Sequence, residues 1–125
     1  MHEVTAVRRI DKPWGHEEIF AFADGLFCGK TLHVNAGESL SLQYHERKTE
    51  TVSVWSGRAR FEVGPTADRL EVLELGKGQS LHLPAGTVHR LTALTDVVVL
   101  EASTPEIDDV VRIDDRYGRT EPAAV

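Results

Sequence analysis

Residues that favour tight turns recur at short intervals along this chain, and this spacing restricts the fold more than any other feature of the sequence. Most segments between the turns are six to ten residues long, too short for typical helices, and are rich in Val, Leu, Phe and Thr. Such segments are typical of β-strands, and about nine are expected, so the chain is predicted to be all-β. The turns are expected at 24–25, 35–37, 56–57, 64–65, 76–78, 84–86 and 95–96.

Apolar and charged residues alternate in the segment 59–63, as in a strand with one wet face, whereas 97–100 is continuously apolar and suits a strand covered on both sides. Many short antiparallel strands in a small domain must hide their edges, which a double-sheet jelly roll or a closed barrel achieves. A length of 125 residues fits one domain. We expect a single domain over 1–125, with a core at about 14–104 and a C-terminal extension at 105–125 that adds a strand or a short helix.

Composition restricts the binding partners and the cellular compartment that are expected for the protein. The formal charge of −6 repels phosphate backbones and anionic membrane surfaces, so neither nucleic acid nor a membrane is an expected partner. Cys28 is the only cysteine, which excludes an intramolecular disulfide and fits a reducing, cytoplasmic setting. No segment reads as a signal peptide or a membrane span.

Four polar residues in separate parts of the chain are candidate metal ligands. Gln43 and His45 lie two residues apart on one expected strand and so point to the same face. Glu50 opens the next strand, where an antiparallel return brings it beside His45, and His89 follows the turn at 84–86. Two imidazoles, a carboxylate and an amide oxygen suit one divalent metal ion, with Zn expected first and Mn, Fe or Ni as alternatives. The alternative is a set of satisfied polar residues around an empty interior.

The spacing of these residues resembles the two sequence motifs of the cupin superfamily. The departures are Gln43, where most cupins have a His, and Ala93, where the second motif often ends in Asn. The resemblance implies the cupin double-stranded β-helix, a jelly-roll barrel, with one metal ion inside. The first motif appears as Gly37, Gln43, His45, Glu50 and Gly57, and the second as Gly78, Pro84, Gly86 and His89.

A narrower resemblance, over about residues 11–119, is to the type II mannose-6-phosphate isomerase cupin domain. Its opening Arg-Pro-Trp-Gly is matched at 12–15, its Ser-Leu-Ser-Leu-Gln-Met-His at 39–45, and its closing segment at 109–119. Where that family continues past the strand's His with more His and then Arg, this chain has Glu, Arg and Lys at 46–48. No segment resembles the guanylyltransferase domain to which such cupins are also fused. The resemblance implies interconversion of mannose-6-phosphate and fructose-6-phosphate.

Isomerisation of an aldose phosphate to a ketose phosphate moves a proton between neighbouring carbons through an enediol, which needs a polarised carbonyl and a base. Lys30 has the parity of an apolar set that is expected to point inward, namely Leu26, Cys28, Leu32 and Val34. It is therefore expected to point inward as a catalytic base or phosphate anchor. Its alternative is a strand-end lysine that reaches solvent. Arg47 and Lys48 are expected to bind a substrate phosphate at the barrel mouth, or else to form a solvated turn.

Two other functions fit the same residues: an iron-dependent dioxygenase of a small organic substrate, and a non-catalytic small-molecule-binding cupin. A homodimer is expected, because small jelly rolls often pair their sheets. Cys28 is predicted to be a small buried residue rather than a nucleophile. The residues expected to be surface or structural are His2, His16, His33 and His82. Those expected to pack, either in the core or on a dimer face, are Trp14, Trp55 and Phe61.

Overall fold

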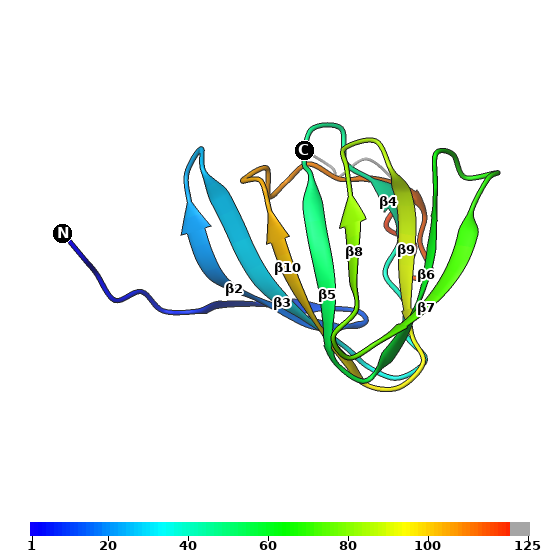
Figure 1. Cartoon of the computed structure of the whole chain (residues 1–125), viewed down its shortest axis with the longest axis horizontal. Helices are drawn as coiled ribbons and strands as arrows, with labels where there is room; N and C mark the ends of the chain where they lie inside the picture. Colours follow the sequence, from blue (N-terminus) through cyan, green and yellow to red (C-terminus); the bar gives the residue numbers. More distant parts are fainter. Residues whose placement is uncertain (121–125) are drawn as a thin grey trace.

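The structure, a computed structural model, describes residues 1–120. It contains eleven strands and no helix within those residues (Figure 1). The all-β prediction is confirmed, with more strands than the nine expected. The strands are β1 (Arg8–Lys12), β2 (Gly15–Ala23), β3 (Phe27–Val34), β4 (Leu42–Tyr44), β5 (Glu50–Ser56), β6 (Arg58–Gly64), β7 (Glu71–Gly76), β8 (Ser80–Leu83), β9 (Val88–Ala93), β10 (Val97–Ser103) and β11 (Val111–Asp114).

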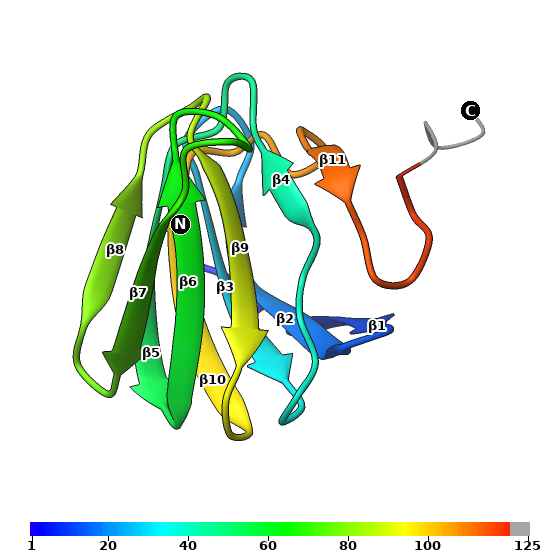
Figure 2. The same cartoon turned by 90° about the vertical axis from the view of Figure 1, so that its right-hand side faces the viewer.

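The strands form two antiparallel sheets that pack face to face (Figure 2). The six-stranded sheet has the order β1-β2-β3-β10-β5-β8, and the five-stranded sheet has the order β11-β4-β9-β6-β7. Strands that are neighbours in a sheet are often distant in sequence, as β3 and β10 are. This is the jelly roll predicted from the sequence.

The core lies between the sheets and follows the alternation of the strands. Phe61 and Val99 are buried from opposite sheets, and Trp14 closes the core beside the start of β2. The packing predicted for Phe61 and Trp14 is confirmed. Trp55, by contrast, is 59% exposed and lies outside the core formed by residues 1–120. Leu26, expected to point inward, is exposed in the turn before β3, so that expectation was wrong.

Two glycines of the predicted motifs form turns whose positive φ angles favour glycine. Gly57 joins β5 to β6 with a φ of 83°, and a Cβ there would lie 2.2 Å from the carbonyl oxygen of Asp96. Gly86 has a φ of 87°, and its N–H donates to the carbonyl oxygen of His45 at 2.7 Å. The second contact fixes the turn before β9 against the end of β4, so it holds two parts of the expected metal site together.

The C-terminal extension folds back across the barrel. Its strand, β11, pairs with β4 at the edge of the five-stranded sheet (Figure 2). Of the two forms predicted for this extension, the strand is therefore the one observed. The last part of the extension, 121–125, lies outside the described residues. Within 1–120 there is also no helix of the length and apolarity needed to cross a membrane.

Candidate metal centre

Three elements bring His45, Glu50 and His89 together inside the barrel. His45 follows β4, Glu50 is the first residue of β5, and His89 lies on β9, where its neighbour across the sheet is Gln43. Glu50 Oε1 lies 3.3 Å from Nε2 of His89 and 3.7 Å from Nε2 of His45. All three side chains are buried, and one donor atom from each lies within 4.8 Å of the others.

The outer nitrogens of both imidazoles are held by backbone carbonyls. Nδ1 of His89 lies 2.9 Å from the carbonyl oxygen of Thr87, and Nδ1 of His45 contacts the carbonyl oxygen of Asp109. A ring nitrogen beside a carbonyl oxygen carries its proton there, so each Nε2 is directed toward Glu50. Nε2 of His45 is fully buried and has no hydrogen-bond partner among the described residues. A buried nitrogen lone pair without a partner is unfavourable, and a bound cation would satisfy it.

Charged neighbours keep Glu50 ionised. Burial opposes its ionisation, but the two imidazoles and the Lys48 ammonium lower the pKa of Glu50 well below its ordinary value. Lys48 Nζ lies 3.0 Å from Glu50 Oε2 and 2.9 Å from Glu101 Oε2. Burial also opposes the charge of Lys48, but these two carboxylates raise its pKa. Lys48 thus balances two buried carboxylates and leaves Glu50 Oε1 facing the imidazoles.

Gln43, the fourth expected ligand, lines the same interior, and its side-chain oxygen accepts a hydrogen bond from the Ser41 hydroxyl at 2.6 Å. The hollow beside Gln43, Glu50 and His89 has a volume of about 30 Å³, enough for one ion or water molecule. Two imidazoles and a carboxylate around such a space fit a divalent first-row metal ion. Coordination by Gln43 remains a proposal.

A larger cavity of about 550 Å³ shares Ser41, Gln43 and Glu101 with this hollow. Lys30 lies on its wall, inward as its parity predicts, with Nζ 3.4 Å from Glu17 Oε2 and 3.8 Å from Glu101 Oε2. Burial and the nearby charge of Glu50 raise the pKa of Glu101 above that of an ordinary glutamate. The cavity wall therefore carries a buried, alternating chain of cations and carboxylates that ends at Glu50.

The two residues expected at the barrel mouth lie elsewhere. Lys48 is on the buried wall of the cavity, because its ammonium turns back to Glu50 and Glu101. Arg47 is exposed and borders a separate surface hollow beside Glu106 and Asp109. Arg47 therefore does not line the large cavity, and Lys48 lines it with its ammonium already paired.

Other cations line that cavity instead. Lys12, Arg112 and Arg119 contribute to its lining, and burial together with Arg119 lowers the pKa of Arg112. Nε of Arg112 is buried without a hydrogen-bond partner among residues 1–120, whereas Arg119 forms an ion pair with Asp115 at 2.9 Å. Burial is the main cause of the lowered pKa of Lys12, and the nearby cations contribute to it. Lys12 Nζ lies 3.9 Å from Glu17 Oε1, and Glu17 opposes the lowering of the Lys12 pKa. Arg112 is thus the one of these three cations without an ion pair among residues 1–120, and it favours an anionic ligand.

The sequence reasoning missed Glu17, Glu101 and Arg112 as cavity residues. A signal for Glu101 was present, since it has the parity of Val97 and Val99, which are buried on β10. Arg112 was not detectable in this way, because its place depends on the extension crossing β4.

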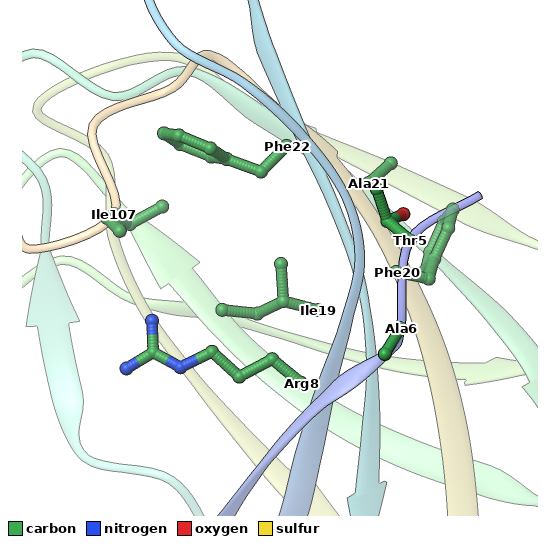
Figure 3. A pocket seen from close by; sticks show the side chains of 8 residues that line it. All are labelled: Thr5, Ala6, Arg8, Ile19, Phe20, Ala21, Phe22 and Ile107. Carbon is green, nitrogen blue, oxygen red and sulfur yellow. The ribbon is translucent and has the colours of Figure 1, made fainter. Parts of the chain in front are cut away.

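The remaining residues of interest lie outside this centre. Cys28 is buried, as predicted, and burial raises the pKa of its thiol. His82 is exposed, and Nδ1 of its ring lies 2.9 Å from the hydroxyl of Thr51. A hollow of about 310 Å³ lies at the β1–β2 edge, where Ile19 and Phe22 lie near Ile107 (Figure 3). Its lining is mainly apolar and includes no cluster of metal-ligating side chains.

The two-sheet jelly roll and the buried His-Glu-His group define a cupin. KdgF from Halomonas sp. superimposes with a TM-score of 0.69 at 22% identity, over 78% of this chain and 87% of that one. The S161A variant of oxalate decarboxylase from Bacillus subtilis superimposes with a TM-score of 0.73 at 18% identity, over 85% of this chain and 30% of that one. The Bacillus subtilis oxalate decarboxylase has Mn(II) centres.

The chain belongs to the family "Mannose-6-phosphate isomerase C-terminal", whose model matches residues 1–115. It is 35% identical to the mannose-1-phosphate guanylyltransferase ManC of Salmonella typhimurium, over 94% of this chain and 24% of that protein. It is 36% identical to the xanthan biosynthesis protein XanB of Xanthomonas campestris, over 94% of this chain and 25% of that protein. The chain thus spans about a quarter of the length of these relatives.

Proposed function

We propose that the protein is a metal-dependent sugar-phosphate isomerase that interconverts mannose-6-phosphate and fructose-6-phosphate. One observation supports this proposal above all: His45 of the His-Glu-His group lines the same cavity as Lys12, Arg112 and Arg119. The other two members of the group, Glu50 and His89, line the small hollow that shares Gln43 and Glu101 with this cavity. A phosphorylated sugar needs both parts, a metal beside the reacting carbonyl and cations for the phosphate.

His45, Glu50 and His89 would hold the ion, with Gln43 as a fourth ligand and Zn, Mn, Fe or Ni as the metal. A divalent ion bound there supplies polarisation of the substrate carbonyl. Its ligands are buried, so water has limited access to them. Glu50 is kept anionic by Lys48, which maintains the charge that attracts the ion.

The proton transfer is assigned to Lys30 together with Glu101. Glu101 takes the proton from C2 of the aldose, the C–H electron pair forms the C1–C2 double bond, and the electron pair of the C1 carbonyl moves onto O1. The C2 hydroxyl proton then passes to O1, the electron pair left on O2 forms the C2 carbonyl, and the C1–C2 electron pair takes the proton back from Glu101 at C1 to give the ketose. A raised pKa makes a carboxylate a better base near neutral pH, which favours Glu101 for this step. Lys30, which is ion-paired with Glu17 and Glu101, keeps the carboxylate in place and supplies positive charge to the enediol.

The phosphate is assigned to Arg112, with Lys12 and Arg119 beside it. Arg112 is the strongest candidate because its buried Nε has no partner in the described part of the chain. Lys48 is occupied by two carboxylates and Arg47 lies outside the cavity, so the proposal gives neither of them direct phosphate contact.

A coupled assay for fructose-6-phosphate tests the proposal, with metal-free protein loaded separately with Zn²⁺, Mn²⁺, Fe²⁺ or Ni²⁺. Mannose-6-phosphate is expected to be converted, whereas unphosphorylated mannose is not. Glu101→Gln is expected to lose turnover while keeping the metal, and Arg112→Gln to raise KM about tenfold or more. Arg60→Gln, on an exposed position of β6, is the matched control.

Three outcomes would overturn the assignment. Oxygen consumption by the Fe²⁺ form without isomerisation would indicate a dioxygenase. A rise in Tm with mannose-6-phosphate but no turnover in any metal form would indicate a binding protein. Equal turnover of mannose and mannose-6-phosphate would remove the role of the cations.

The homodimer expected from the sequence remains a prediction. Its best place is the β1–β2 edge, because Phe20 and Phe22 are about half exposed there beside the apolar hollow of Figure 3. Light scattering of the wild-type protein and of Phe20→Ser tests it: a dimer that the substitution dissociates would support this surface, and a wild-type monomer would exclude it.

A further inference from the structure

A second group of metal-ligating side chains lies on the outer face of the six-stranded sheet. Glu17 faces the cavity, so its neighbours on β2, His16 and Glu18, face away from it. On β3, His33 lies directly opposite His16, and Thr31 lies opposite Glu18. This group is therefore separated from the interior metal centre by the sheet itself.

The donor atoms of this outer group are as far apart as atoms that bind the same metal ion. Nε2 of His16 lies 3.4 Å from Oε1 of Glu18, and one donor atom from each of His16, Glu18 and His33 lies within 4.8 Å of the others. Ligands bound at 2.0–2.1 Å to a tetrahedral zinc ion are about 3.4 Å apart. The His16–Glu18 pair already has this separation.

The surroundings favour binding by a cation from solvent. The side chains of His16 and Glu18 are 20% and 36% exposed, so they are accessible yet partly fixed by their neighbours. Oγ1 of Thr31 lies 3.0 Å from Nε2 of His33 and holds that ring from the side, as outer partners of metal-bound histidines do. On β1, Arg9 lies opposite Glu18 and Asp11 lies opposite His16, and the side chains of Arg9 and Asp11 pair with each other at 3.0 Å.

We propose that His16, Glu18 and His33 form a second site, on the outside of the sheet, for a divalent transition-metal ion that prefers imidazole, such as Zn²⁺. The two rings are stacked with centroids 4.2 Å apart and planes 7° apart. Since a nitrogen lone pair lies in the plane of its ring, binding turns at least one ring out of the stack. The ion joins β2 to β3 and stabilises the edge of the sheet that carries β1.

Calorimetric titration of the metal-free protein with Zn²⁺ at neutral pH tests this site. The wild-type protein is expected to bind two equivalents, and His33→Gln to lose one of them, with affinity for it reduced about tenfold or more. His82→Gln is the matched control, because His82 is an exposed histidine of the same sheet outside both groups. An equivalent number of bound ions in the wild-type protein and in His33→Gln, whether one or two, would overturn the proposal.

Two further measurements do not depend on that variant folding well. In the wild-type protein, Zn²⁺ beyond one equivalent is expected to shift the imidazole NMR signals of His16 and His33 while those of His82 stay in place. Glu18→Gln is expected to weaken the same binding step. Unchanged signals from both rings would show that the outer group binds no zinc. This result is independent of isomerase activity, because neither ring faces the cavity.

Discussion

The Lys48 ammonium lies 3.0 Å from a carboxylate oxygen of Glu50, and both side chains are at least nineteen-twentieths buried. Glu101 contacts the same ammonium, so one lysine neutralises two carboxylates that burial would otherwise destabilise. The free energy of this arrangement depends on the lysine being present, and a cation at the neighbouring metal centre can replace part of its charge.

Replacement of Lys48 by Met is expected to lower the free energy of unfolding of the metal-free protein by about 3–5 kcal/mol, because two buried carboxylates lose their cation. Saturating Zn²⁺ is expected to recover part of this loss by binding beside Glu50. Urea denaturation with and without metal measures both effects. A metal-free Lys48→Met protein as stable as wild type would show that the pairing contributes nothing.

Replacement of His45 by Ala is expected to abolish stoichiometric metal retention in the interior. Two of three strong donors would remain, and the missing one is the imidazole whose Nε2 has no other partner within residues 1–120. Elemental analysis of protein purified from metal-supplemented culture measures the loss, and His82→Ala is the control. Both variants also carry His33→Gln, which removes the outer site from the measurement. Retention of a full equivalent by the His45→Ala protein would show that the ligand set is wrong.

Much of the fold and part of the site follow from local sequence patterns. The strand at 59–63 and the turn at Gly57 are properties of neighbouring residues, so their sequence is enough to predict them. The convergence of His45, Glu50 and His89 was predicted from motif spacing, because an antiparallel turn and a strand start fix where each residue lies.

The remaining parts of the site depend on contacts between distant segments. In the sequence Lys48 belongs to a charged turn, and only the packing of β5 against β10 places it between Glu50 and Glu101. Arg112 reaches the cavity because β11 pairs with β4, a contact that no local pattern predicts. Long-range pairing of this kind is what a single sequence leaves undetermined.

Acid is expected to weaken the end of the extension through Asp115. Hydrogen bonds from Arg119 lower the pKa of Asp115 below its ordinary value of 3.8. The folded state therefore holds the proton less tightly than the unfolded state, so the stabilisation is present at neutral pH and is lost as the pH falls below about 3.8. Asp115→Asn should cost about 1–3 kcal/mol of unfolding free energy at neutral pH.

The difference between Asp115→Asn and wild type should shrink as the pH falls, which denaturation curves at several pH values would reveal. Asp68→Asn replaces an exposed aspartate and is the control. It should change neither the free energy of unfolding nor the dependence of that free energy on pH. A constant difference across the acid range would show that the charge of Asp115 is not responsible.

Asp109 is expected to control metal affinity without touching the metal. Its carboxylate accepts hydrogen bonds from the backbone N–H groups of Arg47 at 2.7 Å, Lys48 at 2.9 Å and Glu46 at 3.1 Å, and its carbonyl oxygen contacts Nδ1 of His45. Asp109→Ala releases the turn between two ligand-bearing segments, so the affinity of the interior centre for Zn²⁺ should fall about 10- to 100-fold. Asp109→Asn keeps one acceptor oxygen, so its affinity for Zn²⁺ should lie between those of the wild type and of Asp109→Ala.

Asp108→Ala, a substitution of an exposed neighbour, is the control for this prediction. Calorimetry in the His33→Gln background measures the affinity of the interior site alone. Wild-type affinity in Asp109→Ala would mean that the imidazole and the turn hold their positions without the Asp109 carboxylate.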